Sequence, residues 1–391
     1  MKRYLIWGLG LMCCASSVQA QQIEEILQSV AQNNVELQAR QQELEAAGLE
    51  IKMQNSLEDP SVEYSPFFRK GENGMTSSEL VVKQGFDFPT VYAARGKAGK
   101  LQRSALERQW DVARQEVLLQ AKNLCLDLVL YNQTRELLEE RKKNADEMLA
   151  LFEKRLQEGD ANILEVNKIN MERMNVQTEV AQNMAAHRTA LQQLLALNGN
   201  RPLNFSSDRY PRTEAPADFN ALYDEVMASD AQLQAANMEA QAAEQVVQVN
   251  KQNWLPKLEV AYRRNTDMSE SSNGFLIGGS LPLYSSQRKL KIARAQALSA
   301  RLTLDDARLQ REAALHGQFN ELCRLKEAMD VYDIPLMHET LRMLHDAVVA
   351  GQLSIIEFYV ETENVYQNLQ AYMSLENQYQ KLLAEVYRCR L

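Results

Sequence analysis

The chain has 391 residues, of which 45% are hydrophobic and 24% charged, a balance that excludes wholesale disorder. Its formal charge of −9 and pI near 5.3 argue against a nucleic-acid-binding protein, which carries a basic surplus. A mean hydropathy of −0.41 excludes a bundle of membrane-spanning helices, but it does not exclude a membrane β-barrel, whose short alternating strands barely raise the average.

The N-terminus has the three parts of a secretory signal peptide. Lys2 and Arg3 are basic, residues 4–12 form an apolar stretch too short to span a bilayer, and Val18-Gln19-Ala20 fits the small-x-small cleavage pattern. We therefore predict that residues 1–20 are removed after Ala20, which leaves a charge of −11 on an exported protein. Lipidation at Cys13 or Cys14 stays open as an alternative.

An internal repeat dominates the remaining chain. Residues 23–64 align without a gap on residues 219–260, at an offset of 196. Two further anchors follow in order: Phe88-Pro89 over Leu281-Pro282 at offset 193, and residues 159–165 over residues 351–357 at offset 192. Three collinear anchors indicate two copies of one unit of about 190 residues. We assign residues 21–200 to the first repeat, 201–217 to a linker and 218–391 to the second repeat.

Each repeat opens with a helix and continues into a β-hairpin. In the first repeat, apolar residues from Ile23 to Ile51 keep helical spacing, and Pro60 ends the helix. Alternating apolar and polar residues then predict strands at about 61–68 and 79–88, and in the second repeat at about 257–264 and 275–283. Pro89 and Pro282 end the two hairpins, because proline cannot donate to the ladder.

Long helices follow each hairpin. No proline occurs from Thr90 to Leu156, and apolar residues recur there at helical spacing, which predicts a rod on the order of 100 Å at about 1.5 Å per residue. Gly159 ends this helix, and a return helix is expected from about Ile163 to Leu197. In the second repeat we expect a long helix from about Gln287 to Val349, kinked at Pro335, and a final return helix after Gly351.

The strand count calls for an oligomer. Four amphipathic strands cannot close a barrel alone, and open sheet edges are not tolerated in lipid. Three copies would supply twelve strands for a barrel and twelve helical rods for a continuous tube. The predicted fold is therefore mainly α with a small β part: a trimeric 12-stranded β-barrel continuous with a 12-helix α-barrel. Aromatic residues of the hairpins would supply the interfacial girdle: Tyr64, Phe67, Phe68, Phe86, Phe88, Tyr92, Tyr262, Phe275 and Tyr284.

The sequence shows no sign of catalytic or cofactor chemistry. The three cysteines after the cleavage site, Cys125, Cys323 and Cys389, lie far apart and have no CxxC spacing. His338 and His345 are seven residues apart, which is not a metal-ligand spacing. No nucleotide or nucleophile motif occurs. We therefore expect no enzyme activity, no metal and no cofactor.

In the order of its predicted elements (helix, hairpin, long helix, return helix) and in their duplication, the chain resembles the TolC family of outer-membrane efflux proteins over nearly all of its mature length. The most specific segments are residues 34–37, Pro60 and Pro256, residues 278–283 and residues 349–357. The compact length is similar to the heavy-metal-efflux (CzcC-like) branch. The resemblance implies a homotrimeric exit duct in the outer membrane, with its helical part in the periplasm. It also implies a periplasmic adaptor, an inner-membrane pump and outer-membrane lipid as partners, and no nucleic acid.

The resemblance also implies functional residues at the two helix-turn-helix tips. Adaptor contact is expected at six tip residues: Gly159, Asp160, Gly351, Gln352, Leu353 and Ser354. Glu165 and Glu357, six residues past each glycine, would form an acidic ring at a periplasmic entrance that favours cations, with Glu361 as a further candidate. The alternative for these glutamates is a solvated helix face.

Strand alternation predicts which charged residues face the inside of a barrel. Charge on a lipid-facing surface is costly, so we expect five residues in the lumen: Glu63, Lys83, Asp87, Glu259 and Arg263. The function that the sequence favours is passive conduction of substrates delivered by a pump. The alternative is a soluble periplasmic coiled-coil scaffold or adaptor, which would share the long helices but would not need two aromatic hairpins. The cargo stays open.

Overall fold

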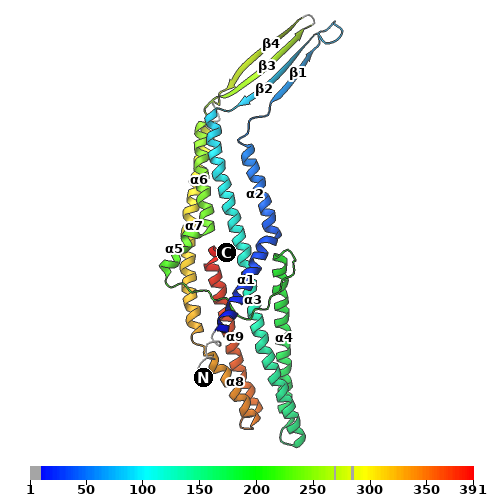
Figure 1. Cartoon of the computed structure of the whole chain (residues 1–391), viewed down its shortest axis with the longest axis vertical. Helices are drawn as coiled ribbons and strands as arrows, with labels where there is room; N and C mark the ends of the chain where they lie inside the picture. The colour runs from blue at the N-terminus through cyan, green and yellow to red at the C-terminus, as the bar shows by residue number, and fades with distance from the viewer. Residues whose placement is uncertain (1–9, 268–269, 283–285) are drawn as a thin grey trace, which may run out of the picture. The chain divides into compact units, whose positions relative to one another are not determined.

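The computed structural model describes residues 10–267, 270–282 and 286–391. The predicted signal residues Lys2 and Arg3 lie outside the described residues, as do Leu283 and Tyr284. Figure 1 shows the chain as helices and one small sheet. None of the described helices combines the length and the apolar character that a bilayer-crossing helix needs.

The first repeat contains four helices and two strands. Their bounds are α1 (Gly10–Asn33), α2 (Val35–Met53), β1 (Ser61–Phe67), β2 (Ser77–Phe86), α3 (Pro89–Glu158) and α4 (Ile163–Leu197). The second repeat contains α5 (Phe219–Ser229), α6 (Ala231–Gln252), β3 (Lys257–Asp267), β4 (Ser271–Ser280), α7 (Ser286–Met329), α8 (Ile334–Val349) and α9 (Ile355–Val386), followed by a short 3₁₀ turn at Arg388–Arg390. The return helix α4 has the bounds that the sequence predicts.

The opening helix of each repeat is broken in two, where the periodicity predicts one continuous helix. Asn34 is buried, and its side-chain Oδ1 accepts a hydrogen bond from the Leu37 backbone N–H (2.9 Å). Asp230, at the equivalent position of the second repeat, caps α6 by accepting from the Leu233 N–H (3.1 Å). Asn and Asp favour such local capping bonds over a continuous helix, so the break recurs at the same place in both repeats.

The long helix of the second repeat is also divided, which corrects the prediction of one kinked helix from Gln287 to Val349. Helix α7 ends at Met329 and α8 begins at Ile334. Asp333 caps α8 by accepting from the Leu336 N–H (3.0 Å), and Pro335 stands in the first turn of α8. Proline suits the first turn because that position needs no amide donor, so here it starts a helix and does not kink one.

The two hairpins join into a single antiparallel sheet in the order β1-β2-β3-β4. Within each hairpin, Val62 pairs with Val82 and Tyr262 with Phe275, and between the hairpins Val82 pairs with Tyr262. Strands β1 and β4 are the two edges of this sheet. Strand pairing therefore joins the hairpin of the first repeat to the hairpin of the second.

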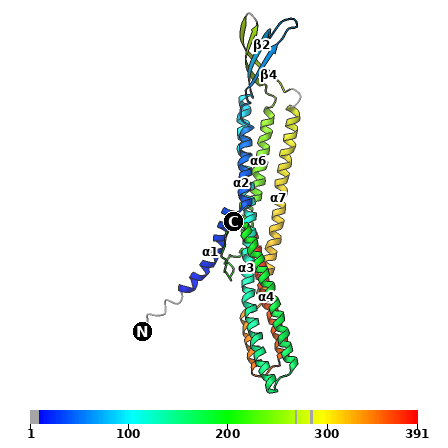
Figure 2. The same cartoon turned by 90° about the vertical axis from the view of Figure 1, so that its right-hand side faces the viewer.

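The repeats are not two separate compact bodies, because each compact unit takes parts of both. One unit contains residues up to Gln38, Ala113–Ser229 and Glu312–Leu391, and the other contains Ala39–Val112 and Asp230–Arg311. The second unit holds the sheet with α2, α6 and the sheet-proximal parts of α3 and α7 (Figure 2). The first unit holds both helix-turn-helix tips.

Each unit has its own buried residues. In the first unit, one apolar cluster packs α1 against α3 and α4 around Val30, Leu128 and Leu194, all fully buried. A second cluster joins α3, α4, α8 and α9 near the tips through Phe152, Ile169 and Phe358. In the second unit the helices are packed largely through small side chains, among them the buried Ala98, Ala105, Ala242 and Ala293.

Candidate functional site at the helix tips and on the sheet

Both helix-turn-helix tips reverse the chain at a glycine. Gly159 has a φ of +84° and Gly351 a φ of +72°, in the left-handed region that residues with a Cβ avoid. After α3, the Asp160 N–H donates to the Arg155 carbonyl (2.8 Å), and after α8 the Gln352 N–H donates to the Ala347 carbonyl (2.9 Å). These bonds satisfy carbonyls at the helix ends and make the two turns alike.

The residues predicted to contact an adaptor are mostly exposed. Asp160 and Gln352 are exposed, as are the two glycines and Ser354. Leu353 differs, because it packs partly against the apolar cluster near the tips. Exposed apolar side chains of the following turns extend this surface: Ile163, Leu164 and Ile356 are between 53% and 70% exposed.

Glu165 and Glu357 have a structural role that the sequence reasoning missed. The Asn162 Oδ1 accepts from the Glu165 N–H (3.0 Å), and the Glu165 carboxylate accepts from the Asn162 N–H (2.8 Å). Ser354 and Glu357 form the same reciprocal pair, at 3.2 and 3.1 Å. Each glutamate therefore completes a capping box at the start of a return helix.

The capping bond also affects the charge at the second tip. Hydrogen bonds from the Ser354 hydroxyl and backbone N–H hold the pKa of Glu357 below its ordinary value. The carboxylate therefore stays ionised under more acidic conditions than a free glutamate would. The signal was present in the sequence, since Asn162-x-x-Glu165 and Ser354-x-x-Glu357 both fit the capping-box pattern. Glu361 lies one turn further on and is exposed.

The two tips are joined by a contact inside the first unit. Arg155, near the end of α3, donates from Nη2 to the carbonyl of Val349 at the end of α8 (2.8 Å). Its guanidinium also lies 5.1 Å from the centroid of the Phe152 ring. The positive charge of Arg155 stabilises the C-terminal ends of both helices, where the helix dipoles place partial negative charge.

One face of the sheet carries charge. Glu63 pairs with Lys83 (2.8 Å) across β1 and β2, and Arg263 pairs with Glu79 (2.7 Å) across β3 and β2. Glu259 lies on the same face, opposite Gly85. The predicted residues Glu63, Lys83, Glu259 and Arg263 thus share one face, and Glu79 joins them although the sequence reasoning did not single it out.

Asp87 lies just beyond the strand, where its carboxylate is 3.8 Å from Lys257 Nζ of β3. Strand β2 ends at Phe86, short of the predicted residue 88, and Asp87 follows it as a buried residue. Its carboxylate pairs with Arg95 of α3 (2.6 Å), and its backbone N–H donates to the Tyr92 hydroxyl (3.0 Å). The prediction of a strand residue is wrong here, because Asp87 anchors the start of a helix.

The opposite face of the sheet is exposed and largely apolar, although Arg264 also lies on it. Phe275 and Ile277 on β4 are 83% and 82% exposed, and Val62 and Tyr64 on β1 are 66% and 58% exposed. Paired residues point to the same side, so Val62, Val82, Tyr262 and Phe275 form one continuous row. A contiguous apolar surface of this kind marks a face that is covered by a partner or by lipid.

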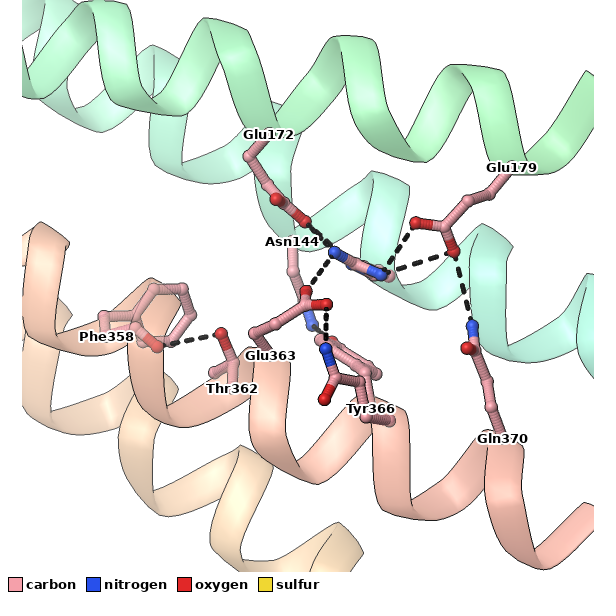
Figure 3. A network of polar contacts seen from close by, with 10 residues as sticks. Asn144, Glu172, Glu179, Phe358, Thr362, Glu363, Tyr366 and Gln370 are labelled. Atoms are coloured by element: carbon pink, nitrogen blue, oxygen red, sulfur yellow. Dashed lines mark hydrogen bonds and ion pairs between the residues drawn. The ribbon is translucent and has the colours of Figure 1, made fainter.

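A buried polar network joins three helices of the first unit (Figure 3). Arg141 of α3 donates from Nε to Glu172 of α4 (2.7 Å) and from Nη2 to Glu363 of α9 (2.6 Å). Its Nη1 also contacts Glu179 of α4 (3.2 Å). The side chains of Arg141 and Glu172 are only 6% and 9% exposed.

Burial alone would lower the pKa of Arg141, but the three carboxylates outweigh it and raise the pKa above its ordinary value. The Arg141 guanidinium lies 5.0 Å from the Tyr366 ring centroid, and Asn144 donates to the Tyr366 hydroxyl (3.3 Å). The sequence reasoning missed this network. Its signal was a charged residue in an apolar row, because Arg141 stands four residues after Leu137 and four before Ala145, both buried.

The described residues contain no group of three or more His, Cys, Asp or Glu side chains arranged to hold a metal ion. Cys125 is buried in the apolar core, and burial raises the pKa of its thiol to about 12. This pattern is typical of a packing residue and not of a nucleophile.

Comparisons with known proteins locate this fold among outer-membrane channels. No family model matches the sequence, and no curated protein matches it either. Among solved structures, the Campylobacter jejuni CmeC outer membrane channel covers 94% of this chain and 85% of its own, with a TM-score of 0.76 and 14% identity. The outer membrane protein VceC of Vibrio cholerae covers 94% of this chain and 96% of its own, with a TM-score of 0.69 and 16% identity. The open state of the Neisseria gonorrhoeae MtrE outer membrane channel covers 94% of this chain and 88% of its own, with a TM-score of 0.70 and 13% identity.

The chain therefore has the fold of outer-membrane channels, as the resemblance to the TolC family predicts. The likeness covers 94% of the chain, so it includes parts of both repeats. At 13–16% identity, this likeness concerns the fold.

Proposed function

We propose that this protein is the outer-membrane exit duct of a tripartite efflux system, which passively conducts substrates delivered by an inner-membrane pump. The observation that carries the proposal is the sheet, which has one exposed apolar face and one charged face on a fold shared with outer-membrane channels. Lipid would cover the apolar face, and water would fill the side that carries Glu63, Lys83 and Arg263.

The free edges of the sheet support a homotrimer. Strands β1 and β4 each have a pairing partner on one side only. Unpaired strand edges cannot remain in lipid, so closure by identical copies follows from the membrane location. Three copies would place twelve strands in one barrel and extend their helices into the periplasm as a tube.

The tips support the proposed periplasmic partners. Both tips are exposed turns with the same geometry, and apolar residues stand beside them. A periplasmic adaptor would contact residues 159–160 and 351–354, and Glu165, Glu357 and Glu361 would form acidic rings at the entrance. Membership of the heavy-metal-efflux branch is part of this proposal.

A soluble scaffold accounts less well for the structure. It would use the helices, but it would leave Phe275, Ile277 and Val62 in water without a function. Fractionation separates the two functions, because a duct stays with outer membranes after a high-salt wash and a scaffold is released.

The decisive experiment combines mass and conductance. The mature protein is extracted in detergent, its mass is measured by light scattering with the detergent contribution subtracted, and it is then reconstituted into planar bilayers. We expect a trimer that forms discrete conducting pores. A monodisperse monomer that is stable without detergent would contradict the proposal, and so would a trimer that never conducts.

A further inference from the structure

Two rows of opposite charge lie on the helices that continue from the two edge strands. Glu43 and Glu50 stand on α2, which leads into β1, and Arg294 and Arg301 stand on α7, which follows β4. All four side chains are exposed. Within the described part of the chain, none of the four takes part in an ion pair.

The two rows have the same spacing. In each row the charged residues are seven apart, so they lie on nearly one face of the helix and about 10 Å apart along it. Helix α2 runs toward the sheet and α7 runs away from it, so the helices are antiparallel. Glu50 and Arg294 are the sheet-proximal members of their rows, and Glu43 and Arg301 are the distal members.

The internal repeat shows how such rows meet. Within one chain, the first repeat contacts the second through the β2–β3 pairing and through Gln109 of α3, which donates to Glu239 of α6. Glu239 is the counterpart of Glu43 in the gap-free alignment. Gln109 is the counterpart of Arg301 at offset 192, where Ala105-Leu106 also aligns with Ala297-Leu298.

We infer that Arg301 and Arg294 of one copy bind Glu43 and Glu50 of a second copy of this chain. Within a copy, the Gln109 amide donates to the Glu239 carboxylate. Between copies, Arg301 would take the place of Gln109 and Glu43 the place of Glu239, so an ion pair would replace the amide–carboxylate hydrogen bond. It rests on the proposed trimer, and it identifies the surface through which the helical parts of the copies recognise one another.

Apolar residues beside the charges fit the same interface. Leu298 and Leu302 of α7 are both 59% exposed, and Leu49 and Met53 of α2 are 64% and 69% exposed. Burying such side chains between copies stabilises the assembly, while the charges at the edge set which helices pair and in which register. A lipid headgroup would satisfy the arginines alone, but it would leave the glutamate row and these apolar residues without a partner.

Charge reversal tests the contact. Glu43→Arg with Glu50→Arg, or Arg294→Glu with Arg301→Glu, should lower the trimer-to-monomer ratio by about tenfold or more, because each places like charges at two sites per interface. The variant with all four changes should recover the trimer. Lys100→Glu on α3 and Glu244→Arg on α6 reverse exposed charges on the helices joined to the two central strands, and as controls they should leave the mass unchanged.

Crosslinking tests the contact independently if a reversal variant fails to fold. In a background with every native cysteine changed to serine, Glu43→Cys with Arg301→Cys should give covalent trimers with a short bifunctional maleimide. The Glu45→Cys with Arg301→Cys control should not. A protein that is trimeric and conducting but does not crosslink would overturn this contact alone, whereas a monomer without conductance would overturn the proposed duct.

Discussion

Glutamate 165 and glutamate 357 show how one residue can serve both a helix and a pore. Each carboxylate closes a capping box, so its position is explained without any role in conduction. A ring of the same carboxylates would still attract cations if three copies meet at the tips. Substitutions that separate hydrogen bonding from charge can distinguish the two roles.

Glu165→Gln with Glu357→Gln should keep the caps, because glutamine also serves in a capping box, while it removes six negative charges from a trimer. We expect lower cation selectivity with only a small decrease in the unfolding midpoint, because glutamine keeps the hydrogen bonds but loses the charge at the helix N-terminus. Glu165→Ala with Glu357→Ala should lower the cation selectivity and should also lower the unfolding midpoint clearly, because alanine removes the capping bonds. Reversal potentials in a salt gradient and thermal unfolding measure the two effects, and unchanged selectivity in the glutamine variant would leave these residues with the capping role alone.

Glu376 provides a pH-dependent prediction. This α9 residue is partly buried near Tyr372, and burial raises the pKa of its carboxyl above the ordinary value of 4.5. A carboxyl with a raised folded-state pKa stabilises the fold below its unfolded pKa, and that stability is lost as pH rises through the folded-state pKa.

Glu376→Gln should therefore raise the unfolding temperature at pH 7, and this gain should disappear below about pH 4.5, where the native carboxyl is protonated in both states. The exposed Glu361→Gln on the same helix is the control and should change the midpoint little at either pH. An equal gain at both pH values would mean that the effect comes from packing and not from ionisation.

At the scale of elements, Arg141 connects helices that are far apart in the sequence. The long helix α3 reaches α4 of its own repeat through Glu172 and α9 of the other repeat through Glu363. Periodicity predicted each helix, and α4 has the predicted bounds. Periodicity could not predict which helices become neighbours, because an apolar row shows that a face is buried but does not show what covers it.

Arg141→Met should destabilise the folded protein by about 3–5 kcal/mol, because it leaves the buried Glu172 carboxylate without its cation. Lys142→Met, one residue further and exposed, should change the free energy of unfolding by less than about 0.5 kcal/mol. Urea unfolding followed by circular dichroism measures both. Arg141→Met with Glu172→Leu should recover part of the loss, and no recovery would mean that the network is not the cause.

The helix breaks at Asn34, Asp230 and Asp333 are also features of this scale. Each is a side-chain cap, and each residue type was visible in the sequence. The apolar spacing continues across the first two breaks, so periodicity alone favoured uninterrupted helices. The local hydrogen bond decided the outcome, since an Asn or Asp side chain replaces a helical backbone bond at low cost.

At the scale of the whole molecule, the two faces of the sheet determine its environment. Ile277 and Leu276 are neighbours on β4 whose side chains point to opposite faces. If lipid covers the apolar face, Ile277→Arg should destabilise the membrane-inserted protein by about 2–4 kcal/mol near the bilayer centre.

Leu276→Arg, directed to the charged face, should be tolerated. The yield of heat-resistant trimer in outer membranes and refolding into lipid vesicles measure the difference. Equal tolerance of the two changes would argue against a lipid-covered apolar face, and with it against the proposed membrane location of the sheet.

The sequence by itself determined the duplicated unit, both hairpins, the return helix α4, the glycine turns and the fold they share with outer-membrane channels. These features depend on residues close together in the chain, where spacing and residue type carry the information. The tertiary structure decided that Asp87 is buried beside Arg95, that Arg141 gathers three glutamates, and that compact units mix the two repeats. Such contacts join residues tens to hundreds of positions apart, and a one-dimensional pattern shows which faces are buried without showing which faces meet.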